Sequence, residues 1–93
     1  MITDLLSRGK ANAITGREIC QALNIHVREL TAAIERERRA GNPICATTGS
    51  NPGYFLAANQ EEMQEYCDSL FRRAGEIHKT RKACLAMIDK LPA

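Results

Sequence analysis

The feature that most constrains the fold is a long series of residues at helical heptad spacing in the C-terminal third of the chain. Successive members lie four and three residues apart over four heptads, which places all of them on one face of a helix. The stretch 60–91 contains no proline and a single glycine, Gly75. It therefore predicts one helix of about 48 Å, at roughly 1.5 Å per residue. The series consists of Met63, Cys67, Leu70, Ala74, Ile77, Arg81, Cys84, Ile88 and Leu91.

The rest of the chain is too short to cover this face. The chain has 93 residues, so residues 1–58 would form a head roughly 25–30 Å across. A second copy of the helix is the simplest partner, which predicts a homodimer. Positions 59–71 carry four acidic and no basic residues, whereas positions 72–93 carry six basic and two acidic ones. This polarity favours an antiparallel pair that sets residues 61–68 against 79–90.

One alternative needs no second copy. A helix that breaks near Gly75 would fold back on its own head and bury the apolar face there, because glycine is a weak helix former.

The middle of the sequence carries the signals of two helices joined by a tight turn. Thr15 followed by Glu18 predicts a capping box, in which each side chain satisfies a free backbone N–H. Asn24 tolerates the left-handed conformation that ends a helix. The next helix is expected over 27–40, with His26 as a helix-start residue, so the pair reads as a helix-turn-helix. The positions expected to face the core are Ile19, Cys20, Leu23, Val27, Leu30, Ala33 and Ile34.

Shorter segments lie on either side of this helix pair. Residues 3–8 are expected to form a short helix, and a loop is expected over 10–13. After the helix pair, the apolar runs 43–47 and 54–57 flank a stretch rich in glycine, asparagine and proline. This pattern predicts a β-hairpin whose loop projects beside the preceding helix as a wing.

A second capping box, Asn59 with Glu62, marks the start of the long helix. The sequence thus predicts a mainly α fold with a small β-hairpin. A winged helix-turn-helix head over residues 1–58 is followed by a long C-terminal dimerisation helix over residues 59–93. No apolar run is long enough to cross a bilayer and no signal peptide is visible. We therefore expect a cytoplasmic protein with no membrane partner.

No constellation of residues indicates a metal site or a catalytic site. Cys20, Cys45, Cys67 and Cys84 form no C-x-x-C pair, and the two histidines lack zinc-finger spacing. Four reduced, mostly buried thiols are the expectation. Neither a nucleophile–base–acid group nor a glycine-rich phosphate loop after a strand is visible. No enzyme activity, no cofactor and no small-molecule effector are therefore expected.

The helix over 27–40 suits the major groove of DNA, because its exposed N-terminal half carries short or hydrogen-bonding side chains. Arg28 fits a guanine edge, Thr31 a base or a phosphate, and Ala32 a thymine methyl group. Glu29 and Glu35 repel phosphates unless they are paired, so a solvated face with internal ion pairs is the alternative. The candidate DNA contacts are Lys10, Arg17, His26, Arg28, Thr31, Ala32, Arg36, Arg39, Ser50 and Asn51.

Three short motifs carry a resemblance to a known domain: TGREI at 15–19, VRELTAAI at 27–34 and GYFLA at 53–57. With them, residues 2–57 resemble the winged helix-turn-helix DNA-binding domains. The head looks most like the biotin-repressor type and the small winged-helix proteins of prophages and mobile elements. The resemblance implies that the second helix of the pair enters the major groove while the wing contacts the adjacent backbone. Glu37 departs from the pattern, because many relatives have leucine there, so the end of this helix is expected to pack differently.

Two functions from different classes follow. The first is a homodimeric, sequence-specific protein that binds double-stranded DNA, most simply a bacterial or phage transcriptional regulator. The alternative is a winged-helix protein-interaction module with little DNA binding, such as an accessory to replication or to a mobile element. A net charge of only +2 and a wing without lysine or arginine favour the alternative. DNA binding that weakens steeply with salt would separate the two.

Overall fold

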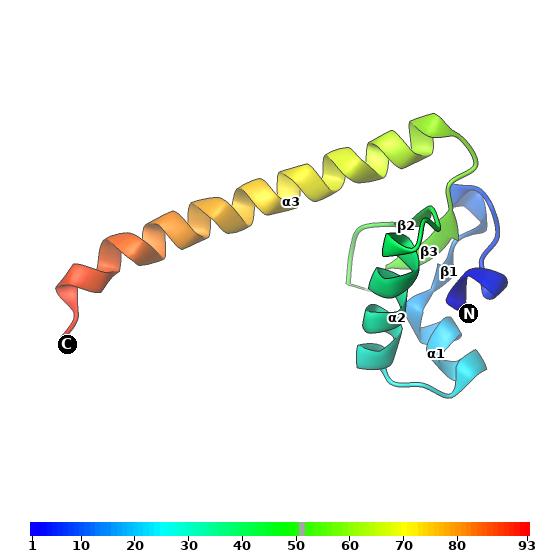
Figure 1. Ribbon diagram of the computed structural model, residues 1–93, viewed down its shortest axis with the longest axis horizontal. Helices are drawn as coiled ribbons and strands as arrows, with labels where there is room; N and C mark the ends of the chain where they lie inside the picture. The colour runs from blue at the N-terminus through cyan, green and yellow to red at the C-terminus, as the bar shows by residue number, and fades with distance from the viewer. Residues whose placement is uncertain (51) are drawn as a thin grey trace.

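A computed structural model describes residues 1–50 and 52–93. It consists of a small head and one long helix that projects away from it (Figure 1). The mainly helical fold with a small antiparallel sheet and a long C-terminal helix is as predicted. The head comprises the 3₁₀ helices η1 (Ile2–Leu5) and η2 (Lys10–Asn12), the strands β1 (Ile14–Thr15), β2 (Ile44–Ala46) and β3 (Gly53–Leu56), and the helices α1 (Gly16–Leu23) and α2 (Val27–Arg39). The projecting helix is α3 (Gln60–Met87), followed by the 3₁₀ helix η3 (Ile88–Lys90).

The sheet has three antiparallel strands in the order β1-β3-β2. The predicted hairpin is β2 with β3, in which Cys45 lies opposite Phe55. The loop expected over 10–13 contains η2, and β1 was not predicted because two residues are too few to show an alternating pattern. Gly53, where β3 passes β1, leaves no room for a side chain: a Cβ there would lie 3.0 Å from the Cβ of Ala13.

Local signals in the sequence set the ends of α1 and the start of α2. Thr15 Oγ1 accepts the backbone N–H of Glu18 at 3.1 Å, which confirms half of the capping box. The Glu18 carboxylate accepts a hydrogen bond from the Thr15 hydroxyl rather than from a backbone N–H. Asn24 ends α1 in the left-handed conformation with φ of 52°. His26 is the N-cap of α2 and donates its backbone N–H to the Glu29 carboxylate.

Two apolar clusters cover the two faces of the sheet, because successive strand residues point to opposite sides. Ile44 belongs to the cluster of α1, α2 and η1, whereas its neighbour Cys45 belongs to the cluster of α3. The first cluster contains Ile2, Leu6, Ile19, Leu30, Ala33, Ile34 and Ile44. The second contains Cys45, Phe55, Ala57 and Tyr66.

Some residues predicted to be in the core are exposed. The first helix is the 3₁₀ helix η1 rather than a helix over 3–8, and Leu5 points away from the core. Val27 is 66% exposed because it lies in the first turn of α2, beyond the edge of the head, and Leu23 at the end of α1 is 40% exposed. Of the four cysteines, all unpaired, only Cys45 is fully buried. Both cysteines of α3 are exposed, so the prediction of mostly buried thiols is wrong.

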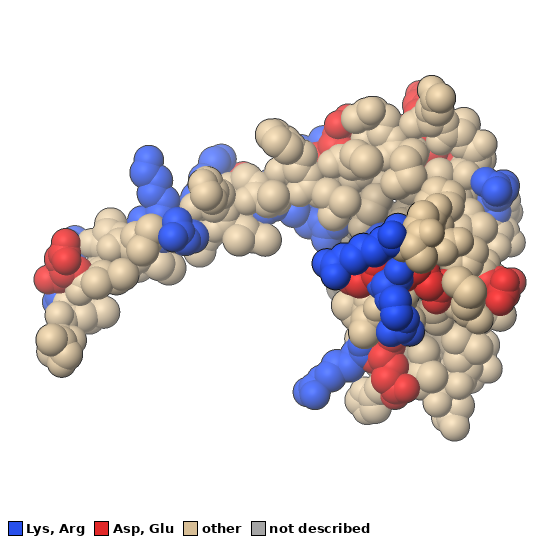
Figure 2. Space-filling view, in the orientation of Figure 1, with Lys and Arg blue, Asp and Glu red and all other residues tan. Residues whose placement is uncertain are grey.

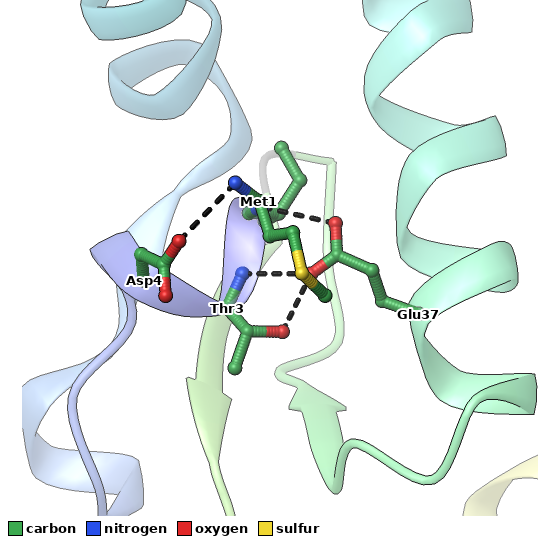
Figure 3. Close-up of polar contacts among 5 residues, drawn as sticks. Met1, Thr3, Asp4 and Glu37 are labelled. Carbon is green, nitrogen blue, oxygen red and sulfur yellow. Dashed lines mark hydrogen bonds and ion pairs between the residues drawn. The ribbon is translucent and has the colours of Figure 1, made fainter.

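Glu37 is the single buried charged residue among those described, and it joins the end of α2 to the start of the chain (Figure 3). Its carboxylate accepts the backbone N–H groups of Ile2 at 2.9 Å and Thr3 at 2.8 Å, together with the Thr3 hydroxyl. Burial alone would raise the pKa of Glu37, but these hydrogen bonds outweigh it and lower the pKa. A carboxylate therefore caps η1 at the position where the resemblance implies leucine.

Helix α3 starts at a joint with the head. Asn59 Oδ1 accepts the N–H of Glu62 at 2.9 Å, which confirms half of the predicted capping box. The Glu62 carboxylate accepts the backbone N–H groups of Ala58 at 2.8 Å and Lys10 at 3.1 Å. These bonds lower the pKa of Glu62. The joint thus connects η2 to the first turn of α3.

Helix α3 runs without a break through Gly75, so the alternative in which it folds back on the head is wrong. It ends at Met87 rather than at the predicted residue 91, because the chain tightens into η3 and Leu91 is extended. Only its N-terminal part contacts the head, where Tyr66 is buried and Met63 is half-buried. Every residue from Phe71 onward in the described chain is exposed. No helix among residues 1–50 and 52–93 is long and apolar enough to cross a bilayer.

Candidate nucleic-acid interface

The outer face of α2 carries four of the ten predicted contacts. Arg28, Thr31, Ala32 and Arg39 are all exposed and lie on one side of the helix, because their spacing keeps them within about 100°. The Thr31 hydroxyl donates to the carbonyl of Val27 at 3.1 Å, so its proton is already used within the helix. Its oxygen remains an acceptor, which suits a base amino group better than a phosphate.

A groove of about 500 Å³ lies between α1, α2 and the β2–β3 loop (residues 47–52). Three of the predicted contacts line it, although they are far apart in the sequence: Arg17 from α1, Thr31 from α2 and Ser50 from the loop. Tyr54 of β3 forms part of its floor. The head therefore brings α1, α2 and the loop together at one surface.

A second groove, of about 440 Å³, lies on the other side of Thr31, between α2, the β2–β3 loop and α3. It is lined by Arg38 of α2, Thr48 of the loop and Arg73 of α3, together with Thr31. Figure 2 shows basic side chains that project from α2 and from the underside of α3 into the angle between the two helices. The two grooves share Thr31 and Tyr54 in their linings, so they adjoin along α2.

Arg38 holds this surface in place and was missed among the predicted contacts. Its Nε donates to the carbonyl of Ile44 at 2.9 Å, and its guanidinium lies 4.8 Å from the ring centre of Tyr66. It thereby connects α2 to β2 and to α3. The sequence does indicate where Arg38 lies on α2, because Arg38 follows Thr31 by seven residues and shares its face of the helix. The contact of Arg38 with the ring of Tyr66 depends on tertiary packing and could not be inferred in this way.

Both exposed acidic residues of α2, Glu29 and Glu35, have partners within the protein. Glu29 accepts the N–H of His26 at 3.2 Å, and Glu35 pairs with Arg38 at 3.4 Å and Arg39 at 3.6 Å. The internal ion pairs of the alternative reading are thus present. Exposed pairs of this kind contribute little, and the Arg39 side chain remains 83% exposed.

Several predicted contacts lie away from this surface. Lys10 lies near Glu62 and Glu65 of α3 in a separate groove. Arg36 lines an apolar groove with Ile2 and Ala33, on the side of α2 that faces the start of the chain. His26 is exposed at the N-terminus of α2, and Asn51 lies outside the described residues.

The predicted dimer face of α3 is divided into two parts. Met63 packs on the protein's own head, and Leu70 lines the groove beside Thr31, so neither is fully free. Farther along, Ile77, Ile88 and Leu91 are 60% to 70% exposed. Cys67, Ala74, Arg81 and Cys84 are also exposed.

Among the residues that the structure describes, no cluster of three histidine, cysteine or acidic side chains is placed to hold a metal ion. Comparisons of the chain with protein-family models, with characterised proteins and with solved structures find no match. The assignment of a function therefore depends on the geometry of the surface.

Proposed function

We propose that the protein binds double-stranded DNA through the outer face of α2, as a winged helix-turn-helix domain in which the β2–β3 loop is the wing. The observation that carries the proposal is the convergence of α1, α2 and the loop at Thr31. Residues from three separate segments line one surface there, with arginines at its edges. A helix flanked in this way suits the major groove, while the flanking arginines suit the phosphates on either side.

The chemistry assigns different roles to the residues of this surface. Arg28 and Ala32 face base edges, as a guanine reader and a thymine-methyl contact, and Thr31 accepts from a base amino group. Arg17 contacts the phosphate backbone on the α1 side, and Ser50 contacts it from the wing. With Glu29 and Glu35 engaged internally, their repulsion of phosphates is reduced. We assign the protein to transcriptional regulation, as a homodimer held by α3.

A second function is favoured by one observation: the described residues of the loop, Thr47–Ser50 and Pro52, carry no charge. The head would then be a protein-interaction module with little affinity for DNA. The two functions differ in their response to salt. A protein that neutralises about three phosphates loses roughly 40-fold in affinity when salt rises from about 50 to 200 mM.

The test is fluorescence anisotropy of a labelled duplex at these two salt concentrations, followed by selection of a preferred site. Arg28→Ala is expected to weaken binding to the selected site by about 1–3 kcal/mol, because it removes a bidentate base contact. Lys90→Ala, which removes one positive charge in η3, beyond the far end of α3, is the control and is expected to leave the affinity unchanged. Absence of binding at low salt, or equal effects of the two variants, would contradict the proposal.

A further inference from the structure

The groove of about 440 Å³ beside α2 joins the long helix to the surface that we propose binds DNA. Thr31, which faces a base edge in the proposed function, lines this groove from α2, and Thr48 lines it from the β2–β3 loop. Arg73 lines it from α3. In Figure 2, basic side chains of α2 and α3 project into the angle between the two helices, where the groove lies. A duplex seated on α2 with the loop beside it therefore borders α3 near Arg73.

The charges in this groove favour an anion. Two arginines, Arg38 and Arg73, line it with one carboxylate, that of Glu35, and its other lining residues are uncharged, so two positive charges stand against one negative charge. Glu35 is already paired with Arg38 at 3.4 Å and with Arg39 at 3.6 Å. The Thr48 hydroxyl adds a neutral donor. A phosphate group suits such a set, because its oxygens accept hydrogen bonds from guanidinium and hydroxyl groups alike.

The β2–β3 loop needs these arginines if it is to lie against DNA. Its described residues, Thr47–Ser50 and Pro52, carry no charge, so they cannot neutralise a phosphate. The positive charge beside the loop comes instead from Arg38 of α2 and Arg73 of α3. Arg38 is half-buried and fixed in the wall of the groove, because its Nε donates to the carbonyl of Ile44 and its guanidinium lies over the Tyr66 ring.

Arg73 is held beside the groove but remains exposed. None of the ion pairs within residues 1–50 and 52–93 involves it. It follows the buried Tyr66 by seven residues, so the two lie on the same side of α3, two turns apart. Because Tyr66 packs on the head, this spacing keeps Arg73 on the side of α3 that faces the groove.

We propose that Arg73, together with Arg38 and Thr48, binds a backbone phosphate of the duplex that α2 reads, on the side of the β2–β3 loop. This inference rests on the proposed function and extends its DNA interface from the head to α3. The long helix then takes part in DNA binding through its first half, whatever covers the second. A phosphate contact carries no base information, so it adds affinity equally on every sequence.

The test measures how the affinity of the full chain for DNA depends on salt, by fluorescence anisotropy from about 50 to 200 mM. Arg73→Ala is expected to lower the slope of log affinity against log salt by about 0.9, so that the loss of affinity over this range is roughly 3.5-fold smaller than in the wild type. The change is expected alike on the selected site and on a random-sequence duplex. Arg73→Lys, which keeps the charge, is expected to retain the slope of the wild type.

Arg72→Ala is the matched control. Arg72 is the neighbouring residue and has the same charge, but it lines a different groove, on the side of Glu62 and Glu65. Its removal is expected to leave the slope unchanged. Circular dichroism of each variant checks that α3 keeps its helicity.

A second measurement identifies the phosphate directly. Single phosphates of the selected duplex are replaced, one at a time, by uncharged methylphosphonates. Neutralising the phosphate that Arg73 contacts is expected to weaken binding of the wild type but not of Arg73→Ala, because that variant has already lost the contact. A position that shows this difference would support the inference.

The outcomes separate this inference from the proposed function. Equal slopes for Arg73→Ala and Arg72→Ala, in a protein that binds DNA and is weakened by Arg28→Ala, would overturn the inference and leave the α2 surface in place. An effect of Arg73→Ala on the selected site alone would also overturn it, since that result indicates base reading. Absence of DNA binding by the wild type at low salt would overturn both proposals.

Discussion

The two halves of α3 share one spacing of residues, yet they have different surroundings. In the first half, Met63 and Tyr66 pack against the sheet, and Arg38 of α2 lies over the Tyr66 ring. In the second half, the residues at the same heptad positions are all exposed. Periodicity thus identifies which residues share a face, but not what covers that face. Tyr66, the most buried residue of α3, is not a member of the heptad series.

The largest effect is expected from a substitution that removes the packing of the head against α3. Tyr66→Ala should lower the free energy of unfolding by about 3 kcal/mol, because it leaves a cavity against Cys45 and Phe55. Ile77→Ala, in the uncovered half, should change it by less than about 0.5 kcal/mol at concentrations where the chain is a monomer. Urea denaturation measures both. Tyr66→Phe, which keeps the ring, is the control, and equal effects of the two alanine variants would contradict the comparison.

A smaller effect is expected where a head element depends on one carboxylate. Glu37→Gln should cost about 2 kcal/mol, because an amide cannot accept from both Ile2 and Thr3 and places its own N–H groups against one of them. Glu35→Gln, an exposed position on the same helix, should cost less than about 0.5 kcal/mol.

The same carboxylate predicts a pH dependence. The pKa of Glu37 lies below its ordinary value of 4.5, so the native state binds fewer protons than the unfolded state as the pH falls. The stabilisation is therefore fully present above pH 4.5 and is lost as the pH drops through the lowered pKa. Denaturation between about pH 6 and 3 should show a shallower pH dependence in Glu37→Gln than in the wild type. Glu62, whose pKa is also lowered, remains in both proteins. Identical slopes would contradict this assignment.

The smallest effect is expected at a glycine in the exposed half of α3, which we compare with a glycine in the sheet of the head. Gly75→Ala should stabilise α3 by about 0.5–1 kcal/mol, because a Cβ there meets nothing within 4 Å and the chain loses freedom in the unfolded state. Gly53→Ala in the sheet should destabilise the head, because its Cβ would press on Ala13. Thermal melts followed by circular dichroism compare the two. A loss of stability in Gly75→Ala would show that the uncovered half is not a free helix.

The parts of the structure predicted from the sequence are those governed by local chemistry. Thr15, Asn24 and Asn59 mark helix ends with side chains that act within a few residues, and all three do so in the structure. The strand β1 and the buried bonds of Glu37 depend on segments far apart in the chain. No local pattern indicates such contacts.

The same division applies to the candidate site. The exposure of Arg28, Thr31 and Ala32 follows from the helical period. Arg38 and Arg73 join the surface only because α3 packs beside α2. Lys10 leaves it because η2 is attached to the joint at Glu62. Tertiary packing therefore decides which elements supply residues to this surface. The sequence pattern does not indicate that packing.

The joint at Glu62 has a mechanical consequence. Two backbone N–H groups from different segments meet on the Glu62 carboxylate, and α3 extends about 38 Å beyond this residue. A long rigid arm on a short base is a lever, so a rotation of about 10° at its base moves the tip by roughly 7 Å. That distance equals the rise of about two base pairs of DNA. The angle at which Glu62 sets the arm therefore determines how far apart two heads joined at their tips would stand.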